Sequence, residues 1–354
     1  MNETAFIDVR APVEFAIGSL PNATNLPILN DEERALIGLT YKNEGNEAAI
    51  KLGYNLVSGE VKNSRVNSWV SFIRENPESV IYCFRGGLRS QITQKWIQEA
   101  GIERPIIKGG YKRVRNFLID EVDSISENSK MVILSGTTGS GKTKFLNEVK
   151  SFYPGLDLEA LACHRGSAFG ATNTNQPSQI NFENNLALFL MQFKTSALKE
   201  IPLLVEDESR LIGSRALPKS FFDRMRASPV LWIEETLEGR LNNIFEDYIL
   251  NEMFDKDNDL VLAIFARYKA SVQKISKKMG GLRTQELIGL LKKSEDDYIN
   301  SNELSSNKEW IEKLLVYYYD PLYLSSLERR KANILFKGNR FECAVFLKEF
   351  KLKA

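Results

Sequence analysis

Short apolar runs alternate with stretches of helical periodicity in the first third of the chain. Residues 5–9 (AFIDV) and 79–84 (SVIYCF) have the length and composition of short buried strands. Residues 67–73 and 91–97 repeat their apolar side chains at helical spacing instead. Strands that alternate with helices predict an α/β fold built on a parallel sheet.

A second series of strands follows the polar segment 120–130, which we interpret as the end of a helix followed by a domain boundary. Four apolar segments are its predicted strands: 131–134, 201–205, 229–233 and 333–336. Residues 236–328 have a mainly helical pattern. The sequence therefore predicts one domain over residues 1–122 and a second α/β domain over residues 128–354.

The composition fits a globular protein and excludes several classes. The chain has 354 residues, 43% of them apolar and 26% charged, which suits two or three domains. No apolar run is long enough to span a bilayer, and the first residues lack the basic and apolar regions of a secretory signal. The three cysteines are too few for a disulfide framework or a zinc cluster. We therefore expect a cytoplasmic protein with no membrane contact.

The predicted strand at 79–84 delivers Cys83 into the loop CFRGGLRS. A thiol reacts as its thiolate, and a thiolate needs positive potential around it. Gly86 and Gly87 allow backbone N–H groups to point at the sulfur, and Arg85 and Arg89 add formal charge near a helix start. We predict Cys83, Arg85 and Arg89 as catalytic residues that stabilise an anion on sulfur or bind a phosphate-like donor. The alternative is that Cys83 is an ordinary buried thiol.

The segment GTTGSGKT matches the phosphate-binding pattern G-x-x-x-x-G-K-[ST] and follows a predicted strand. Its predicted phosphate-binding residues are Gly136, Thr137, Thr138, Gly139, Ser140, Gly141, Lys142 and Thr143. The loop amides wrap a phosphate, Lys142 supplies charge to the outer phosphates, and Thr143 offers a hydroxyl to Mg²⁺. The pattern requires a diphosphate or polyphosphate ligand but does not define ATP hydrolysis.

Two further loops of the second domain hold candidate residues. Glu206 and Asp207 follow a predicted strand, where P-loop proteins place a metal-binding acid, and we favour Asp207 with Thr143 for Mg²⁺. The alternative is an ordinary acidic strand end. His164 and Arg165 lie in a glycine-flanked polar loop that suits either an anion contact or a structural turn.

Basic residues are concentrated within the predicted helical region. The net charge of the chain is only +1, yet residues 265–293 hold eight basic residues against the single acid Glu286. Such segregation favours contact with a phosphate backbone, although a solvated helical face is the common alternative. The RNA-binding candidates are Arg267, Lys274, Lys277, Lys278 and Arg283, together with a second cluster at Lys112, Arg113 and Arg115.

Residues 8–15 (DVRAPVEF) and 18–27 (GSLPNATNLP) resemble the N-terminal signature of rhodanese domains. Gly109-Gly110-Tyr111 stands where that fold has its closing glycine-rich turn, so the resemblance covers residues 5–118. It implies a domain whose cysteine carries a chalcogen and passes it to an acceptor.

The complete order of motifs resembles the bacterial tRNA 2-selenouridine synthase family over about residues 5–215. Besides the two loops, the matching segments are 29–34, 56–61, 164–167, 176–183 and 206–213. The last segment adds Arg210 to the candidate residues. The resemblance implies a rhodanese-like parallel-sheet domain followed by a P-loop NTPase-like α/β domain with a helical C-terminal region.

The resemblance also implies a two-step exchange of sulfur for selenium in the wobble 2-thiouridine of tRNA. Geranyl diphosphate first alkylates the sulfur while the P-loop binds its diphosphate. Selenium from selenophosphate then replaces the geranylthiol, with Cys83 carrying or positioning the selenium. We expect tRNA and the synthetase that makes selenophosphate as partners. We expect no tightly bound cofactor, and both a reaction with Mg²⁺ and one without it are compatible with the residues.

Two other functions remain compatible with the residues. An ATP-dependent tRNA sulfurtransferase would use a Cys83 persulfide and would consume ATP without any isoprenoid. A P-loop switch with an inactive rhodanese module would survive loss of the Cys83 thiol.

Overall fold

The computed structural model describes residues 4–167, 169–170, 175–330 and 332–351. The chain divides into two compact units. Unit 1 comprises residues 1–125 and 177–192, and unit 2 comprises residues 126–176 and 193–354. Both units are α/β with a parallel sheet, as the sequence predicted.

Unit 1 is built on a three-stranded parallel sheet in the order β2-β1-β3. Its strands are β1 (Phe6–Asp8), β2 (Ala23–Asn25) and β3 (Val80–Tyr82). Its helices are α1 (Pro12–Ile17), α2 (Asp31–Glu44), α3 (Asn46–Leu56), α4 (Gly59–Glu75), α5 (Leu88–Glu99), α6 (Gly110–Asn128) and most of α9 (Gln179–Thr195). Trp69 of α4 and Ile97 of α5 are fully buried in one core with Ile7 and Ile81 of the sheet.

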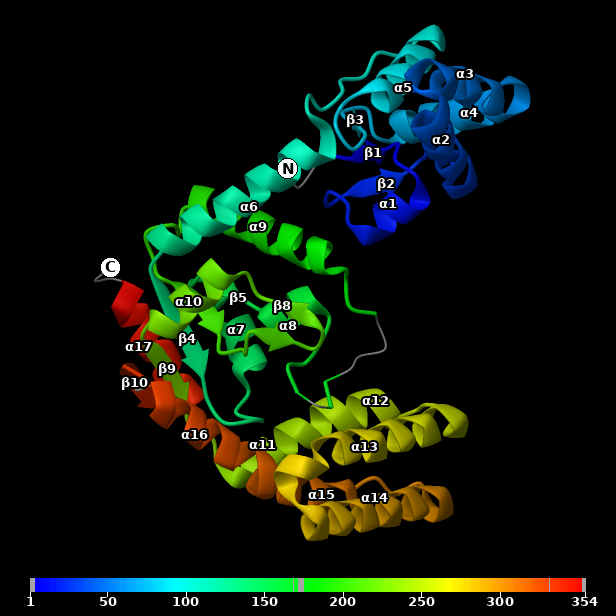
Figure 1. The fold of residues 1–354 in the computed structure, drawn as a ribbon. Helices are drawn as coiled ribbons and strands as arrows, with labels where there is room; N and C mark the ends of the chain where they lie inside the picture. Colours follow the sequence, from blue (N-terminus) through cyan, green and yellow to red (C-terminus); the bar gives the residue numbers. More distant parts are fainter. Residues whose placement is uncertain (1–3, 168, 171–174, 331, 352–354) are drawn as a thin grey trace. The chain divides into compact units, whose positions relative to one another are not determined.

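The helix α9 belongs to unit 1 although the flanking segments belong to unit 2. Asn181 accepts a hydrogen bond from the Ser19 backbone N–H at 2.8 Å, and the buried Asn184 donates to the Ser19 carbonyl at 2.7 Å. Arg115 of α6 donates to Asn184 at 2.8 Å and pairs with Glu183, so α9 lies along α6 (Figure 1). This segment lies inside the range predicted for the P-loop domain.

Unit 2 contains a five-stranded parallel sheet in the order β10-β9-β4-β6-β5 and a small antiparallel pair of β7 and β8. The strands are β4 (Met131–Ser135), β5 (Gly155–Leu156), β6 (Leu203–Glu206), β7 (Leu211–Ile212), β8 (Arg215–Ala216), β9 (Val230–Ile233) and β10 (Ile334–Gly338). The helices α7 (Lys142–Val149), α8 (Leu158–Ala162), α10 (Lys219–Ala227) and α17 (Arg340–Lys351) belong to this sheet region. Apolar side chains of α7 and α17 share one buried cluster with the sheet. All four strands predicted for this domain are present.

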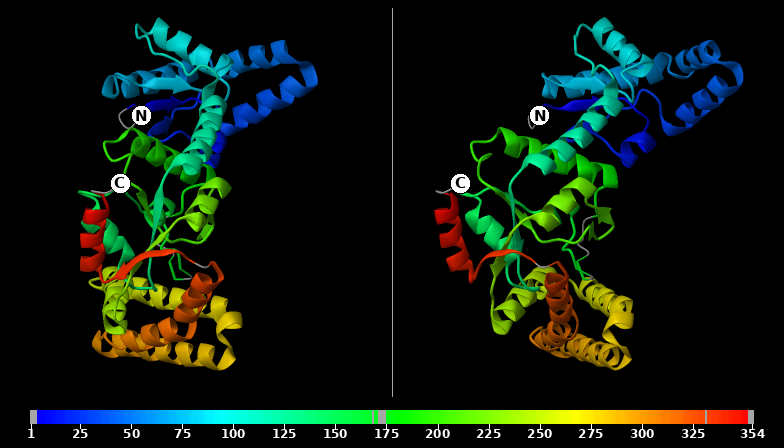
Figure 2. Two further views of the ribbon diagram at one scale, coloured as in Figure 1. Left: turned by 90° about the vertical axis from the view of Figure 1, so that its left-hand side faces the viewer. Right: turned by 60° about the vertical axis from the view of Figure 1, so that its left-hand side comes forward.

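The region after β9 is helical, as predicted, and has its own core. Its elements are α11 (Leu237–Ile244), η1 (Phe245–Leu250), α12 (Asn251–Met253), α13 (Asn258–Met279), α14 (Gly281–Ser301), α15 (Asn307–Leu314), η2 (Leu315–Tyr319) and α16 (Asp320–Arg330). The helices α13 and α14 run side by side in every view (Figures 1 and 2). Tyr268, Leu287 and Trp310 are among the buried residues that join α13, α14 and α15. Among the described residues, no helix has the length and apolar character that crossing a membrane requires.

Candidate functional site

Cys83 lies directly after β3, at the start of the loop that leads into α5. Its side chain is only 3% exposed. The Sγ atom lies 3.2 Å from Ser90 Oγ and 3.8 Å from the Gly87 carbonyl oxygen. Ser90 Oγ itself donates to that carbonyl at 2.9 Å. These contacts hold the sulfur at the first turn of α5, the positive end of the helix dipole.

The closing glycine-rich turn packs backbone against backbone on the cysteine loop. The Tyr111 N–H donates to the Cys83 carbonyl at 2.9 Å. Gly110 has a φ of +59°, and a Cβ there would lie 2.4 Å from that carbonyl oxygen. Gly86 has a φ of +64°, and its Cβ would lie 2.6 Å from the Ile107 carbonyl oxygen. Only glycine satisfies both the left-handed backbone and the close approach, so the two turns fix the path of the loop.

The two arginines of the cysteine loop have different surroundings. Arg89 Nη1 donates to Glu14 Oε2 at 2.5 Å, and Arg34 Nε lies 3.5 Å from the same oxygen. Arg85 is exposed and has no hydrogen bond or ion pair with another residue in the described ranges. Among the described residues, Arg85 is therefore the arginine of this loop whose charge no carboxylate offsets, whereas Glu14 pairs with Arg89.

The P-loop of unit 2 is held in place by residues of α11. Gly139 and Gly141 have φ values of +84° and +80°, the left-handed backbone that glycine favours. Arg240 Nε donates to the Thr138 carbonyl at 2.9 Å, and Asn243 Nδ2 donates to the Gly139 carbonyl at 2.9 Å. Sequence reasoning missed both residues, because they lie about a hundred positions from the motif (102 for Arg240) and carry no local signal.

A cavity of about 940 Å³ opens beside the P-loop. One part of its lining is polar and includes Lys142 and Thr143. Another part is aromatic, formed by Phe222, Tyr248, Tyr318, Tyr319 and Tyr323. Lys142 Nζ lies 5.7 Å from the centroid of the Tyr323 ring, so the two parts adjoin. The cavity thus places the P-loop next to ring faces of the kind that bind an apolar chain, a base or a cation.

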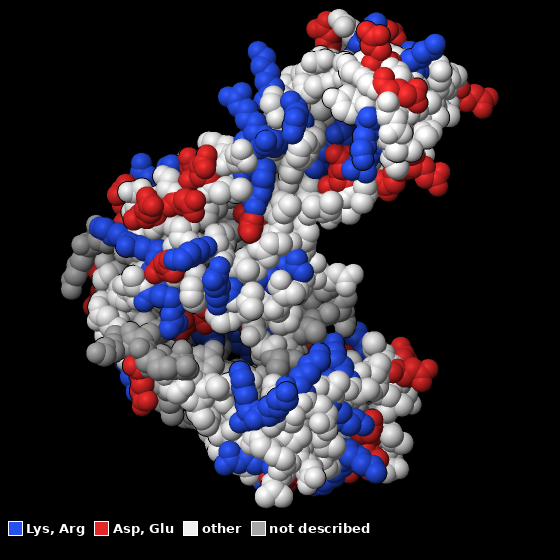
Figure 3. All heavy atoms as spheres, in the orientation of Figure 1, with Lys and Arg blue, Asp and Glu red and all other residues white. Residues whose placement is uncertain are grey.

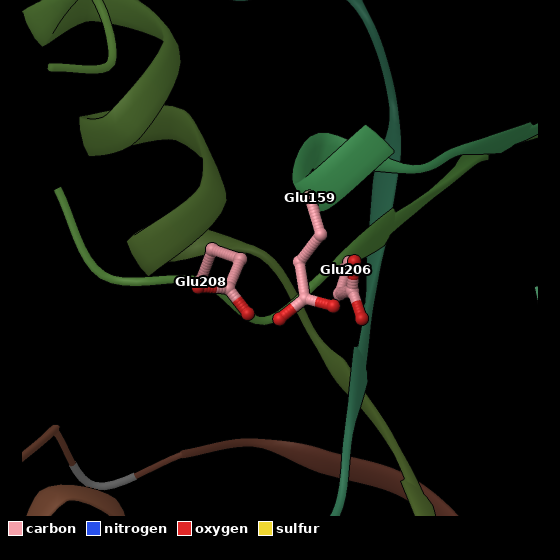
Figure 4. Close-up of side chains that lie close together, drawn as sticks. All are labelled: Glu159, Glu206 and Glu208. Carbon is pink, nitrogen blue, oxygen red and sulfur yellow. The ribbon is translucent and has the colours of Figure 1, made fainter. Parts of the chain in front are cut away.

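Three glutamates meet at the polar end of this cavity. Ligand oxygens of Glu159, Glu206 and Glu208 all lie within 4.8 Å of one another (Figure 4). Burial, followed by the charge of the neighbouring carboxylates, raises the pKa of Glu159 and of Glu208 to about 8. The same causes raise the pKa of Glu206 well above its ordinary value. Burial opposes the charge on Lys142, yet nearby Tyr323 and the acids Glu206 and Glu208 raise its pKa above the ordinary value.

Glu206 lies within hydrogen-bonding distance of the P-loop hydroxyl. Thr143 Oγ1 lies 3.5 Å from Glu206 Oε1, and the other oxygen of this buried carboxylate has no hydrogen-bond partner among the described residues. Asp207, which we favoured from the sequence, accepts a hydrogen bond from Ser135 Oγ at 2.5 Å and lies 3.9 Å from Arg226. A hydroxyl and several carboxylate oxygens fit the preference of Mg²⁺ for oxygen ligands.

The remaining candidates of unit 2 fall into two groups. Arg165 and Arg210 line the cavity, and Arg165 also pairs with Glu252 at 2.6 Å and lies over the Tyr248 ring. His164 is not part of the lining, and burial lowers the pKa of its imidazole. The structure therefore brings the two arginines to the P-loop cavity and leaves His164 outside it.

The basic segment 265–293 is partly neutralised by acids from outside it. Arg267 pairs with Glu252, and Lys269 pairs with Glu295. The candidates Lys274, Lys277, Lys278 and Arg283 are exposed, and Figure 3 shows many basic side chains on the helical part at the bottom of the view.

The second predicted RNA-binding cluster lies in unit 1. There Lys112 and Arg113 are exposed at the start of α6. Arg115 is engaged with Glu183 and Asn184 and serves to hold α9. The exposed subset in each unit is what remains available to a phosphate backbone.

The two loops define a class of protein in which a rhodanese-like cysteine domain is joined to a P-loop domain. Residues 1–116 match the rhodanese-like domain, and residues 129–354 match the tRNA 2-selenouridine synthase AAA domain. The chain belongs to the tRNA 2-selenouridine synthase family.

Similar proteins cover nearly the whole chain. The tRNA 2-selenouridine synthase of Bdellovibrio bacteriovorus is 53% identical over 96% of this chain and 93% of its own length. Those of Nitrosomonas europaea and Pseudomonas syringae pv. tomato are 52% and 43% identical, over 95% and 99% of this chain and 92% and 95% of their own lengths. A solved N-terminal domain of a putative ATP/GTP binding protein from Clostridium difficile 630 is 32% identical over 33% of this chain and 89% of its own, with a TM-score of 0.31.

Proposed function

We propose that the protein is a tRNA 2-selenouridine synthase that replaces the sulfur of a wobble 2-thiouridine in two steps, geranylation and then selenation. The observation that carries this proposal is the presence of two unlike sites on a chain of this family. A buried thiol lies in a glycine-shaped loop, and a phosphate loop adjoins an aromatic cavity. Sulfur transfer from a persulfide without ATP would not need the second site.

In the first step, the 2-thiouridine sulfur attacks C1 of geranyl diphosphate. The C1–O bond breaks, pyrophosphate leaves with the electron pair, and the base loses its N3 proton. Lys142 and the loop amides neutralise the charge that grows on the pyrophosphate, which lowers the barrier to its departure. The ring faces of Tyr318, Tyr319 and Tyr323 suit both the isoprenoid chain and the positive charge at its allylic carbon.

Mg²⁺ fits this site as a charge-neutralising ion. Thr143 and Glu206 would hold it, with Glu159 and Glu208 alongside, and the ion would offset the negative charge of the diphosphate. Asp207 remains a prediction as a ligand, through its position one residue after β6.

In the second step, the selenium of selenophosphate attacks C2 of the geranylated base. The C2–Se bond forms, the C2–S bond breaks, and geranylthiolate leaves with the electron pair and takes up a proton. Water then cleaves the Se–P bond and releases phosphate. Cys83 carries or positions the selenium, and the exposed Arg85 attracts the anionic donor.

The exposed basic residues are the proposed contacts for tRNA. In unit 2 these are Lys274, Lys277, Lys278 and Arg283, and in unit 1 they are Lys112 and Arg113. Backbone contacts of this kind give affinity without sequence selectivity, so they suit a protein that holds a tRNA while a base enters a site.

The test is mass spectrometry of nucleosides from 2-thiouridine tRNA after incubation with the protein. Geranyl diphosphate alone should give the S-geranyl nucleoside, and addition of selenophosphate should give 2-selenouridine. Cys83→Ala should keep the first reaction and lose the second. Lys142→Ala should lose the first by roughly 10²-fold or more, yet selenate a tRNA supplied already geranylated.

The outcomes separate the rival functions. If ATP is consumed and no isoprenoid is transferred, the sulfurtransferase function replaces this proposal. If Cys83→Ala retains full activity in every assay, the rhodanese unit is a binding module. Equal loss of both steps in Cys83→Ala would contradict the division of labour between the two sites.

A further inference from the structure

A second cavity, of about 530 Å³, lies wholly within unit 1. It is bounded by α2, α3 and α5, and its lining is mainly apolar, with its charged side chains gathered at one place. There Glu14 contacts Arg89 at 2.5 Å and Arg34 at 3.5 Å, so the three charged residues of the lining form one ion-pair cluster in which two cations share one carboxylate. The P-loop chemistry does not use this cavity.

The cavity adjoins the reactive thiol. Leu88 and Arg89, the first two residues of α5, belong to its lining. The residues on either side of them, Gly87 and Ser90, are the ones that contact Cys83 Sγ, at 3.8 Å and 3.2 Å. The first turn of α5 therefore contributes residues both to the cavity lining and to the contacts of Cys83 Sγ.

The lining suits a short branched hydrocarbon. Ile37 of α2, Ile50 and Tyr54 of α3 and Trp96 of α5 line it, and the ion-pair cluster holds the only charged side chains among the lining residues. A volume of about 530 Å³ lies in the range of sites that enclose small organic ligands. Under the proposed function, one such group must come to Cys83, because the geranyl chain is attached to the sulfur that selenium displaces.

We propose that this cavity binds the geranyl chain of S-geranyl-2-thiouridine tRNA during selenation, and this rests on the proposed function. The chain would enter past Leu88, which sets C2 of the base beside the Cys83 loop. The ion-pair cluster of Glu14, Arg34 and Arg89 then lies at the polar end of the ligand. As the C2–S bond breaks, geranylthiolate leaves with the electron pair into an apolar site and is protonated, while the C2–Se bond forms. Unit 1 thus binds the geranylthiol leaving group as well as the base.

Filling the cavity tests the proposal. Gly38 lines the cavity on α2, and a Cβ built there meets no atom within 4 Å. Gly38→Phe places a ring in the cavity without helix strain, since glycine is the poorer helix former. The matched control is Gly289→Phe on α14, where a Cβ also meets no atom within 4 Å. Gly289 does not line this cavity.

The kinetic result should be specific for the second step. With pre-geranylated tRNA and selenophosphate, Gly38→Phe should lower kcat/KM at least tenfold and leave geranylation of 2-thiouridine tRNA unchanged. Gly289→Phe should leave both rates unchanged. Full selenation by a folded Gly38→Phe protein, or equal loss of both steps, would overturn the proposal. Absence of geranylation in the unsubstituted protein would instead overturn the proposed function.

A binding measurement keeps the test valid if Gly38→Phe is unstable. Calorimetry of the unsubstituted protein with S-geranyl, S-dimethylallyl and S-methyl 2-thiouridine nucleosides measures the dependence on chain length. Each fully buried carbon favours binding about fourfold, so shortening by five carbons should weaken it by up to roughly 10³-fold. Cys83→Ala should bind the S-geranyl nucleoside as the unsubstituted protein does. Equal affinity for the S-methyl and S-geranyl nucleosides would overturn the proposal.

Discussion

Arg240 offers a direct test of how the P-loop is held. Its guanidinium makes two hydrogen bonds with Asp320, at 2.5 Å and 3.2 Å, and one with the Thr138 carbonyl at 2.9 Å. Arg240 is 8% exposed and Asp320 is 26% exposed, so the pair is screened more than a fully buried one. Arg240→Ala leaves Asp320 unpaired and frees the P-loop carbonyl.

The magnitude follows from these contacts. Breaking a fully buried ion pair costs 3–5 kcal/mol as a rough range, and partial exposure reduces this to about 2 kcal/mol. The hydrogen bond to Thr138 contributes about 1 kcal/mol. We expect a local loss of about 3 kcal/mol, which is roughly a 10²-fold change in an opening equilibrium.

Hydrogen exchange measured on peptides that span the P-loop is the suitable assay, because it reports the local opening of the P-loop. In Arg240→Ala, the amide hydrogens of residues 136–143 should exchange about 10²-fold faster. Calorimetry should show weaker binding of pyrophosphate. The control is Lys337→Ala, whose pair with Glu234 at 2.7 Å is half-exposed and should change exchange by less than about fivefold. Equal effects of the two substitutions, or unchanged exchange in Arg240→Ala, would refute the reasoning.

The remaining predictions concern three other features. Gly110→Ala forces a left-handed residue against the Cys83 carbonyl and should abolish selenation while geranylation persists; normal selenation would show that the turn tolerates a side chain. Glu159 and Glu208 bind protons more tightly in the folded protein than in the unfolded chain, because their pKa values are raised. In a thermal-shift assay with EDTA, the melting temperature should therefore fall as the pH rises from about 5 to 8. Glu208→Gln should make this dependence on pH weaker. Replacing three exposed lysines by alanine should weaken tRNA binding and lower the salt slope of log K by roughly two units; an unchanged slope places the RNA elsewhere. These are Lys274, Lys277 and Lys278.

Features set by local sequence could be predicted well. The strand before the P-loop and the loop itself follow from an apolar run and a glycine pattern that need no distant partner. The same holds for Cys83, since β3 ends one residue earlier and α5 begins at Leu88. Local backbone preference and motif spacing decide both sites.

Features set by contacts between residues far apart in the chain could not be predicted from the sequence. The acids Glu206, Asp207 and Glu208 look equivalent in sequence, but β6 continues through Glu206, and this register turns Glu206 toward Thr143. Charge counting in segment 265–293 overstated the free positive charge, because Glu252 and Glu295 approach it only in the fold. The placement of α9 depends on Ser19, 162 residues before Asn181, and no periodicity reports such a partner.

That placement has a consequence for synthesis on the ribosome. The first unit lacks its last helix until Gln192 has been made, by which time β4 and the P-loop have already emerged. Synthesis of the two units is therefore interleaved in time. We expect α9 to dock on unit 1 before the remaining strands of unit 2 are made. A fragment cut after Asn128 would expose the Ser19 carbonyl and leave Ile180 missing from its cluster with Phe6 and Tyr82. The rhodanese-like unit of this protein is thus encoded in two separate stretches of its gene.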